Sequence, residues 1–338
     1  MRHWKWLSLC LCLSVIGLMI FTSSALAQIK LNYSIFFPAP HKNAVLSTEW
    51  AKEIEKRTGG KVQITMFYGG TLTPADKCYD GVVKGISDIG FSVLAYTRGK
   101  FPLTEVADLP LGMKSGLVAT KMINDYYKKF RPKEFDEVKV MYLHGHGPGI
   151  IHSKKEIKTL EDVKGLKIRC TGMAAKIAKA LGATPVAMPM GETYDALSRG
   201  VVDASMAPQE ALQGWKWGEV VKYTIEDWGA SYSSGMFVVM NKQKWNALPP
   251  DVQKIIEQVN EEYIEKQGKT WDEIDKVGRD YTIKLGNKII SLSSDENLRW
   301  EKAVKPLLDE YKQNMKEKGL PGQEVLSFYL QTIYKYQK

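Results

Sequence analysis

The chain has little cysteine, and its few cysteines fit no structural zinc motif. Of four cysteines in 338 residues, Cys10 and Cys12 lie in an apolar N-terminal stretch, and only Cys78 and Cys170 lie beyond it. One disulfide is possible in an oxidising compartment, but sequence alone cannot pair two distant cysteines. We expect two free, mostly buried thiols.

The sequence also lacks the motifs of common enzymes. It contains no Gly-x-Ser-x-Gly elbow, no Gly-x-x-x-x-Gly-Lys-Ser/Thr loop and no His-Glu-x-x-His pair. His144 and His146 stand two residues apart in a glycine-rich run, but no cysteine or carboxylate follows at metal-ligand spacing. We therefore predict no catalytic residue, no metal site and no cofactor.

The sequence contains no long run of residues with the same charge. The formal net charge is +9, from 47 basic and 38 acidic residues distributed along the chain. No basic run is long enough to predict nucleic-acid binding. A diffuse positive field of this kind favours the capture of small anions.

Residues 1–27 read as a signal peptide. Arg2 and Lys5 precede an apolar run at 7–21, and the small residues at 25–27 (ALA) form a cleavage site before Gln28. A retained membrane anchor is the alternative, but the run is short for a bilayer span, and no other stretch is apolar enough. The cysteines inside the apolar run lack the small residues of a lipoprotein signal. The mature chain would carry 47 − 2 − 38 = +7.

Residues 165–208 predict a parallel α/β unit. Strands are expected at 166–170, 185–188 and 201–205, and helices at 174–181 and 192–199, each helix closed by a glycine. In such units ligands bind at the carboxyl ends of the strands. Arg169 lies at one of these ends, next to the Thr171-Gly172 helix start, whose free N–H groups favour anions. Its guanidinium can form a two-pronged bond with a carboxylate, sulfonate or phosphate; the alternative is a solvated surface arginine.

The rest of the chain also alternates between strand and helix patterns, which predicts an α/β fold. Further strands are expected at 30–36, 62–67, 88–93, 138–143 and 236–240. Further helices are expected at 43–57, 75–84, 117–130, 211–220, 252–284, 296–318 and 323–336, with an apolar loop at 101–111. The helix at 252–284 is long enough to span two lobes, with Gly268 and Gly278 as soft points.

A short internal similarity supports two lobes. Residues 84–88 (KGISD) match 199–203 (RGVVD) in type at every place but the fourth. We expect lobe I to contain 28–150 and 236–275 and lobe II to contain 151–235 and 276–338. Small-molecule sites favour the interface between such lobes.

Two segments of the chain carry a family resemblance: 157–169 (IKTLEDVKGLKIR) and 189–208 (PMGETYDALSRGVVDASMAP). They resemble the solute-binding proteins of tripartite ATP-independent periplasmic (TRAP) transporters, DctP type. The resemblance extends over essentially the whole mature chain. It implies a two-lobed periplasmic binding protein fold similar to type II, with a cleft between the lobes. It also implies a periplasmic protein, expected as a monomer, that captures a small organic anion and delivers it to the small and large membrane subunits of a TRAP permease. Arg169 occupies the position of the arginine that clamps the substrate's carboxylate.

The chain departs from the family pattern where a second arginine commonly contacts the substrate. Pro148 and Gly149 stand there instead. This departure argues against a two-arginine clamp, and we expect His144 or His146 to supply a polar contact.

A second departure replaces an asparagine that contacts the substrate in many family members. Ala207 stands in its place, so this side of the pocket is drier unless Gln209 or Ser205 compensates. Together the departures predict a monoanion with an apolar or aromatic body, such as an aromatic or 2-oxo acid, or a small sulfonate.

Further candidate ligand contacts fall in loops or at strand ends that should face the cleft. They are His41, Asp76, Ser92, Tyr96, His146, Gln209, Trp215 and Tyr232. Asp76 fits equally well as an acid in the first turn of a helix, and the aromatic cluster that includes Trp215 fits core packing. A ligand sensor that presents its bound acid to a membrane receptor would use the same fold and cleft.

Overall fold

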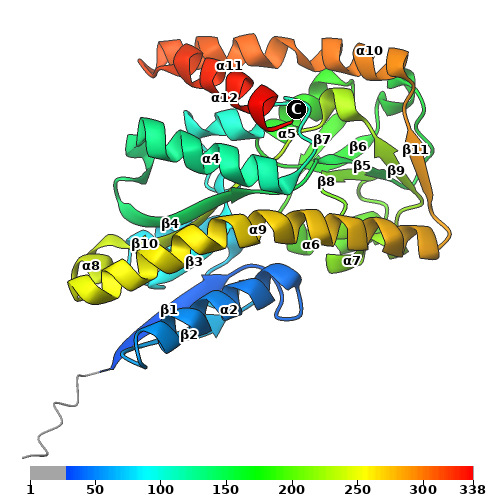
Figure 1. Cartoon of the computed structure of the whole chain (residues 1–338). Helices are drawn as coiled ribbons and strands as arrows, with labels where there is room; N and C mark the ends of the chain where they lie inside the picture. The colour runs from blue at the N-terminus through cyan, green and yellow to red at the C-terminus, as the bar shows by residue number, and fades with distance from the viewer. Residues whose placement is uncertain (1–27, 338) are drawn as a thin grey trace, which may run out of the picture.

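Two β-sheets form the centres of two lobes, and the chain crosses between them (Figure 1). The computed structural model describes residues 28–337, so the predicted signal peptide lies outside the described residues. Within the described part, no helix is both long and apolar enough to cross a membrane.

The first sheet has the strand order β2-β1-β3-β10-β4. Its strands are β1 (Ile29–Ile35), β2 (Val62–Phe67), β3 (Ile89–Val93), β4 (Val138–Gly145) and β10 (Gly235–Asn241). The first three pair in parallel, and β10 inserts antiparallel between β3 and β4. Its helices include α2 (Lys42–Arg57), α3 (Cys78–Val83), α4 (Gly116–Phe130) and the short α8 (Lys242–Asn246). The predicted return of the chain to this sheet at 236–240 is confirmed.

The second sheet has the order β11-β9-β5-β8-β6-β7. Its strands are β5 (Ile150–Ser153), β6 (Lys167–Cys170), β7 (Thr184–Ala187), β8 (Ala204–Ala207), β9 (Tyr223–Glu226) and β11 (Lys288–Ser291). β6 pairs in parallel with both β7 and β8, through α5 (Met173–Ala180) and α6 (Met190–Ser198). The predicted parallel α/β unit is therefore confirmed, and its central strand carries Arg169.

Among the predicted elements whose bounds differ from the structure, three differ for a clear physical reason. The third strand of the unit begins at Ala204 and not at 201, because the N–H groups of Val201 and Val202 bond back to the Ala196 carbonyl. The helix predicted at 211–220 is α7 (Ala211–Gly214), which ends because Lys216 adopts a left-handed conformation. The helix predicted at 296–318 divides at Pro306, whose nitrogen has no hydrogen to donate, into α10 (Ser294–Val304) and α11 (Pro306–Glu317).

The long helix α9 (Pro250–Lys284) is continuous and contacts both lobes. Figure 1 shows it crossing the molecule from the α8 end toward β11. Its two glycines are points of close approach, so the expectation of soft points is wrong. A Cβ at Gly268 would lie 2.8 Å from the Leu117 Cα, and one at Gly278 would lie 2.0 Å from the Gln209 carbonyl oxygen.

The C-terminal helices cover the molecule on the side opposite α2 (Figure 1). α12 (Gly322–Tyr336) packs against α4, where the Tyr336 hydroxyl donates a 2.7 Å hydrogen bond to Asp125. α10 contacts α5 of the second sheet. The lobe boundaries given above remain a prediction.

The two cysteines of the described chain are free and buried, as predicted. Cys78 lies at the start of α3, and Cys170 ends β6. Burial raises the pKa of the Cys78 thiol to about 12 and that of Cys170 to about 11. Because the thiolate is the reactive form, both groups should be inert in the folded protein.

We therefore expect the native mature protein to resist a disulfide reagent at about pH 8, whereas the unfolded protein reacts at both cysteines. Counting the thiols released before and after addition of guanidinium measures this difference. The intact mass should not change on reduction, and a gain of two hydrogens would reveal a disulfide and contradict the assignment.

Candidate functional site

A narrow cavity of about 30 Å³ lies between the two sheets, at the carboxyl ends of β6 and β8. Its apolar wall combines five aromatic residues with aliphatic and methionine side chains; the aromatic residues are Phe36, Phe37, Tyr96, Tyr232 and Trp271. Its polar lining residues are His146, Arg169, Thr171, Glu210 and Ser234. Its place between the sheets and its few polar groups among apolar residues are typical of a small-molecule site, whereas its volume is far below the roughly 300–1,000 Å³ of such sites.

Arg169 is the cation of this cavity and is only 3% exposed. Its Nε donates a 2.9 Å bond to the Met188 carbonyl, and Nη2 lies 3.4 Å from the Tyr96 hydroxyl. Nη1 lies 3.3 Å from the Met190 sulfur. The guanidinium also lies 5.9 Å from the centre of the Trp217 ring. A carbonyl, a thioether, a phenol and an aromatic ring orient the group without neutralising its charge.

No carboxylate within residues 28–337 lies at ion-pair distance from Arg169. Burying an ion without a counter-ion costs several kcal/mol, so such groups are usually paired. The arrangement suits an anion that enters the cavity and accepts hydrogen bonds from the remaining N–H groups of the guanidinium.

His146 lines the cavity but has no ring nitrogen free for a ligand. The Ser234 N–H donates a 3.0 Å bond to Nε2, and Nδ1 lies 2.5 Å from the Gly147 carbonyl, to which it donates. Burial lowers the pKa of His146 to about 4 and that of His144 to about 3. His144 lies outside the cavity lining and accepts a 3.0 Å bond from Trp271. The expected polar contact from His144 or His146 stays a prediction: His146 lines the cavity with both ring nitrogens occupied, and His144 lies outside the lining.

The structure also explains why position 149 carries no arginine. Gly149 and Tyr232 form an antiparallel bridge that joins the two segments crossing between the sheets. A Cβ at Gly149 would lie 2.4 Å from the Tyr232 ring. Tyr232 thus fills the space that a side chain at 149 would need, and a two-arginine clamp cannot form here.

Glu210 is the site residue that the sequence did not predict. Its Oε2 lies 2.8 Å from Nε2 of His41, and both side chains are about 2% exposed. Ala207 also lines the cavity, whereas Ser205 and Gln209 do not. Glu210, three residues after Ala207, is the residue of this segment whose side chain brings a charged group to the cavity lining.

The other predicted residues divide into two groups. Tyr96 and Tyr232 line the cavity, and Trp215 packs behind it, 5.7 Å from Phe37 between ring centres. Ser92 instead donates a 2.6 Å bond to the Ala75 carbonyl within the first lobe. Asp76 lies in the first turn of a short helix at the mouth of the cleft. This position agrees with the alternative interpretation of Asp76 as an acid in the first turn of a helix.

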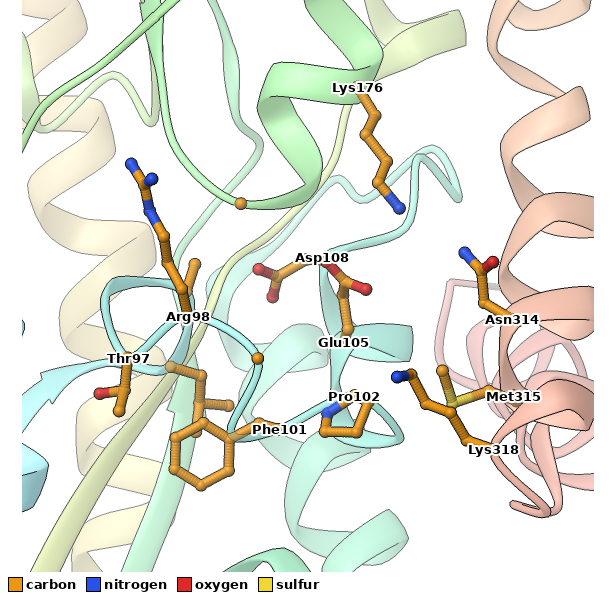
Figure 2. Close-up of a pocket in the computed structure, with 14 residues that line it drawn as sticks. Thr97, Arg98, Phe101, Pro102, Glu105, Asp108, Lys176, Asn314, Met315 and Lys318 are labelled. Carbon is orange, nitrogen blue, oxygen red and sulfur yellow. The ribbon is translucent and has the colours of Figure 1, made fainter.

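A larger pocket of about 440 Å³ lies beside the cavity, between the loop at 94–108, α5 and α11. Figure 2 shows Glu105 and Asp108 of this loop together with Lys176 from α5 and Lys318, the residue after α11. Burial raises the pKa of both carboxyl groups. Cations and acids are interleaved here, so this pocket lacks the isolated cation in an apolar setting that marks the cavity.

Comparison with known proteins agrees with the resemblance seen in the sequence. The chain matches the family described as bacterial extracellular solute-binding protein, family 7 (DctP), over residues 39–314. The 2,3-diketo-L-gulonate-binding periplasmic protein YiaO of Escherichia coli is 27% identical over 257 residues, which cover 72% of this chain and 75% of the relative.

Solved structures show the same fold. A TRAP periplasmic solute-binding protein from Desulfovibrio salexigens is 36% identical, with a TM-score of 0.81 over 92% of this chain and 97% of that chain. One from Rhodoferax ferrireducens, in complex with copurified benzoate, is 28% identical, with a TM-score of 0.87 over 92% and 99%. The chain therefore belongs to family 7 of the bacterial extracellular solute-binding proteins, the DctP family of TRAP transporter binding proteins.

Proposed function

We propose that this protein captures an aromatic monocarboxylate in the periplasm and delivers it to a TRAP permease, without catalysing a reaction. The observation that carries the proposal is the buried guanidinium of Arg169, which no carboxylate of the described chain neutralises. A ligand carboxylate would complete the charge pairing and receive a two-pronged hydrogen bond.

The shape and charge of the cavity support a single anionic group on an apolar body. Apolar residues form most of its wall, five of them aromatic, and Gly149 and Ala207 leave no second donor where family members often have one. The benzoate found in the Rhodoferax relative is a ligand of this type. Aliphatic 2-oxo acids and small sulfonates carry the same anionic head and belong in the same ligand panel.

Binding also requires the lobes to meet around the ligand, and the structure shows where they touch. Gly172, next to the cavity on the second lobe, packs against Ala95 of the first lobe. A Cβ at Gly172 would lie 2.6 Å from the Ala95 Cβ. Two small residues therefore allow the lobes to approach each other in front of Arg169, and we assign this contact to the closed form.

We expect Arg169→Ala to weaken binding of an aromatic acid more than tenfold, because a charge-assisted hydrogen bond contributes about 1.5–3 kcal/mol. A thermal-shift panel of C4-dicarboxylates, 2-oxo acids, aromatic acids, amino acids and sulfonates would first identify the ligand. A ligand at about a hundred times its Kd adds about 2.7 kcal/mol of stability. Titration calorimetry then compares the variant with the wild type.

Arg169→Met separates binding from folding. Replacing an unpaired buried charge with an apolar side chain of similar length should leave the Tm of the ligand-free protein unchanged or raise it, while abolishing binding. An Arg169→Met protein that unfolds at a much lower temperature would show that the arginine is structural. Unchanged affinity in either variant would refute the anion clamp.

Ala95→Leu should weaken binding of every ligand by about tenfold or more, because the larger side chain would overlap Gly172 and hold the lobes apart. The loss should appear mainly in the dissociation rate, measured by stopped-flow fluorescence. Ala95→Ser, which adds one small atom, is the matched control and should bind nearly as the wild type does. Equal affinities of the leucine and serine variants would show that the contact does not govern closure.

Transport distinguishes delivery to a permease from sensing. The mature protein, added to proteoliposomes that contain its small and large membrane subunits, should produce sodium-dependent uptake of the radiolabelled ligand. The Arg169→Met variant should support none. Tight binding without uptake would favour the sensor alternative.

A further inference from the structure

We propose that Glu210 selects the ligand by accepting a hydrogen bond from a neutral hydroxyl group, so that the preferred ligands are hydroxylated aromatic monocarboxylates. This inference rests on the proposed function, because it assumes that Arg169 holds the carboxylate. It adds a second recognition group to the same cavity.

The hydrogen bonds around His41 define what Glu210 offers to a ligand. The Asn43 N–H donates a 3.2 Å bond to Nδ1 of His41, so the ring proton is on Nε2. That proton points to Oε2 of Glu210 at 2.8 Å. The imidazole is therefore a neutral donor that orients the carboxylate through one oxygen and leaves its negative charge in place.

The surrounding backbone fixes this carboxylate. The Glu210 N–H donates a 2.8 Å bond to Oδ1 of Asp275 on α9, and Gly278 packs on the preceding Gln209 carbonyl. A Cβ at Gly214 would lie 2.7 Å from Oε2 of Glu210, so the neighbouring turn closes over that oxygen. These contacts fix the backbone of Glu210, and the His41 hydrogen bond fixes its side chain.

Glu210 and Arg169 line one cavity but remain separate. Within the described residues the two side chains form no ion pair with each other. The cavity therefore offers a cation without an anion and, apart from it, a carboxylate whose Oε2 is held by His41 and whose Oε1 has no donor among the described residues. A ligand with a carboxylate on one side of an apolar ring and a hydroxyl elsewhere satisfies both groups.

The chemistry of the second group favours a hydroxyl over other substituents. A second carboxylate on the ligand would face the Glu210 charge and be repelled. An ammonium group would pair with it, but a buried ammonium must first lose its hydration, which costs several kcal/mol. A hydroxyl loses less hydration and forms a charge-assisted hydrogen bond.

The test is calorimetry of the mature wild-type protein with matched ligands. The pairs are benzoate with 3- and 4-hydroxybenzoate, and phenylacetate with mandelate and 4-hydroxyphenylacetate. A hydrogen bond to a charged acceptor predicts that at least one hydroxylated isomer binds about tenfold to a hundredfold tighter than its parent. Phenyllactate should also bind tighter than phenylalanine, which carries an ammonium in place of the hydroxyl.

Glu210→Gln keeps the size of the side chain and removes its charge. The variant should lose about tenfold of the preference for the hydroxylated isomer while binding the parent acid as well as before or better. Phthalate isomers, which the wild type should reject, should bind the variant more tightly. Glu219→Gln, at an exposed position of the same segment, is the matched control and should change nothing.

The outcomes separate this inference from the proposed function. If no aromatic acid binds the wild type, the proposed function itself fails. If aromatic acids bind through Arg169 but hydroxylation gives no gain, or if Glu210→Gln keeps the full preference, only the role of Glu210 is refuted. If phenylalanine bound more tightly than phenyllactate, Glu210 would recognise an ammonium group. That result would refute the proposal that it selects a hydroxyl group.

Discussion

The arrangement of both lobes depends on how closely α9 approaches their backbones. Gly268 lies against Leu117 at the start of α4, and Gly278 lies against Gln209 beside the cavity. Between them, Asp272 accepts bonds from Ser115 and the first N–H groups of α4, and Asp275 accepts the Glu210 N–H. The two carboxylates are three residues apart on one helix face, and each binds a different lobe. Because these are backbone-level contacts, the lobes cannot slide along α9. The segments that cross between the sheets are joined by the bridge of Gly149 with Tyr232.

In the proposed function, the buried charge of Arg169 is the group that recognises the ligand. A guanidinium held by a carbonyl, a thioether and a phenol remains electrostatically incomplete, and its desolvation cost is offset only when an anion arrives. The neighbouring groups maintain this condition. His146 in the cavity wall remains neutral because burial lowers its pKa to about 4, so it neither attracts the ligand's charge nor titrates near neutral pH. Folding thus preserves one isolated cation among aromatic rings, and the ligand's carboxylate is its natural partner.

The sequence predicts those parts of the fold that depend on neighbouring residues in the chain. The strand–helix–strand pattern around Arg169 depends on periodicity and terminal glycines, and it placed the arginine correctly at a strand end. The four-residue strands β5, β9 and β11 were missed because they are too short to show a period and are stabilised by partners far along the chain. Glu210 was missed for a related reason. Its burial depends on His41, 169 residues earlier, and on Asp275, 65 residues later, so locally it resembles a surface glutamate.

The glycines of α9 illustrate the same limit. A glycine within a helical pattern lowers helix propensity, and the sequence therefore suggested soft points. In the folded protein the missing side chain has a different use, because it permits contact with another backbone, and tertiary packing outweighs the propensity cost of about 1 kcal/mol. Nothing in the local sequence distinguishes these two uses, because the contacted residues lie about 150 and 70 positions away.

The balance of charge in the cavity explains how it can discriminate among acids with a single arginine. Arg169 and Glu210 together carry no net charge, so a bound monoanion leaves one negative charge among the aromatic rings. A dianion would leave two, and its second carboxylate would face Glu210. At a separation of about 6 Å and an effective dielectric constant of about 20, this repulsion amounts to about 3 kcal/mol, or roughly a hundredfold in affinity. Dicarboxylates are therefore excluded by a charge that opposes them, and the absence of a second arginine is only part of the selectivity. A hydroxyl group at the same place would be attracted to Glu210, because it donates a hydrogen bond to the carboxylate. The same carboxylate can therefore repel dicarboxylates and favour hydroxylated monocarboxylates.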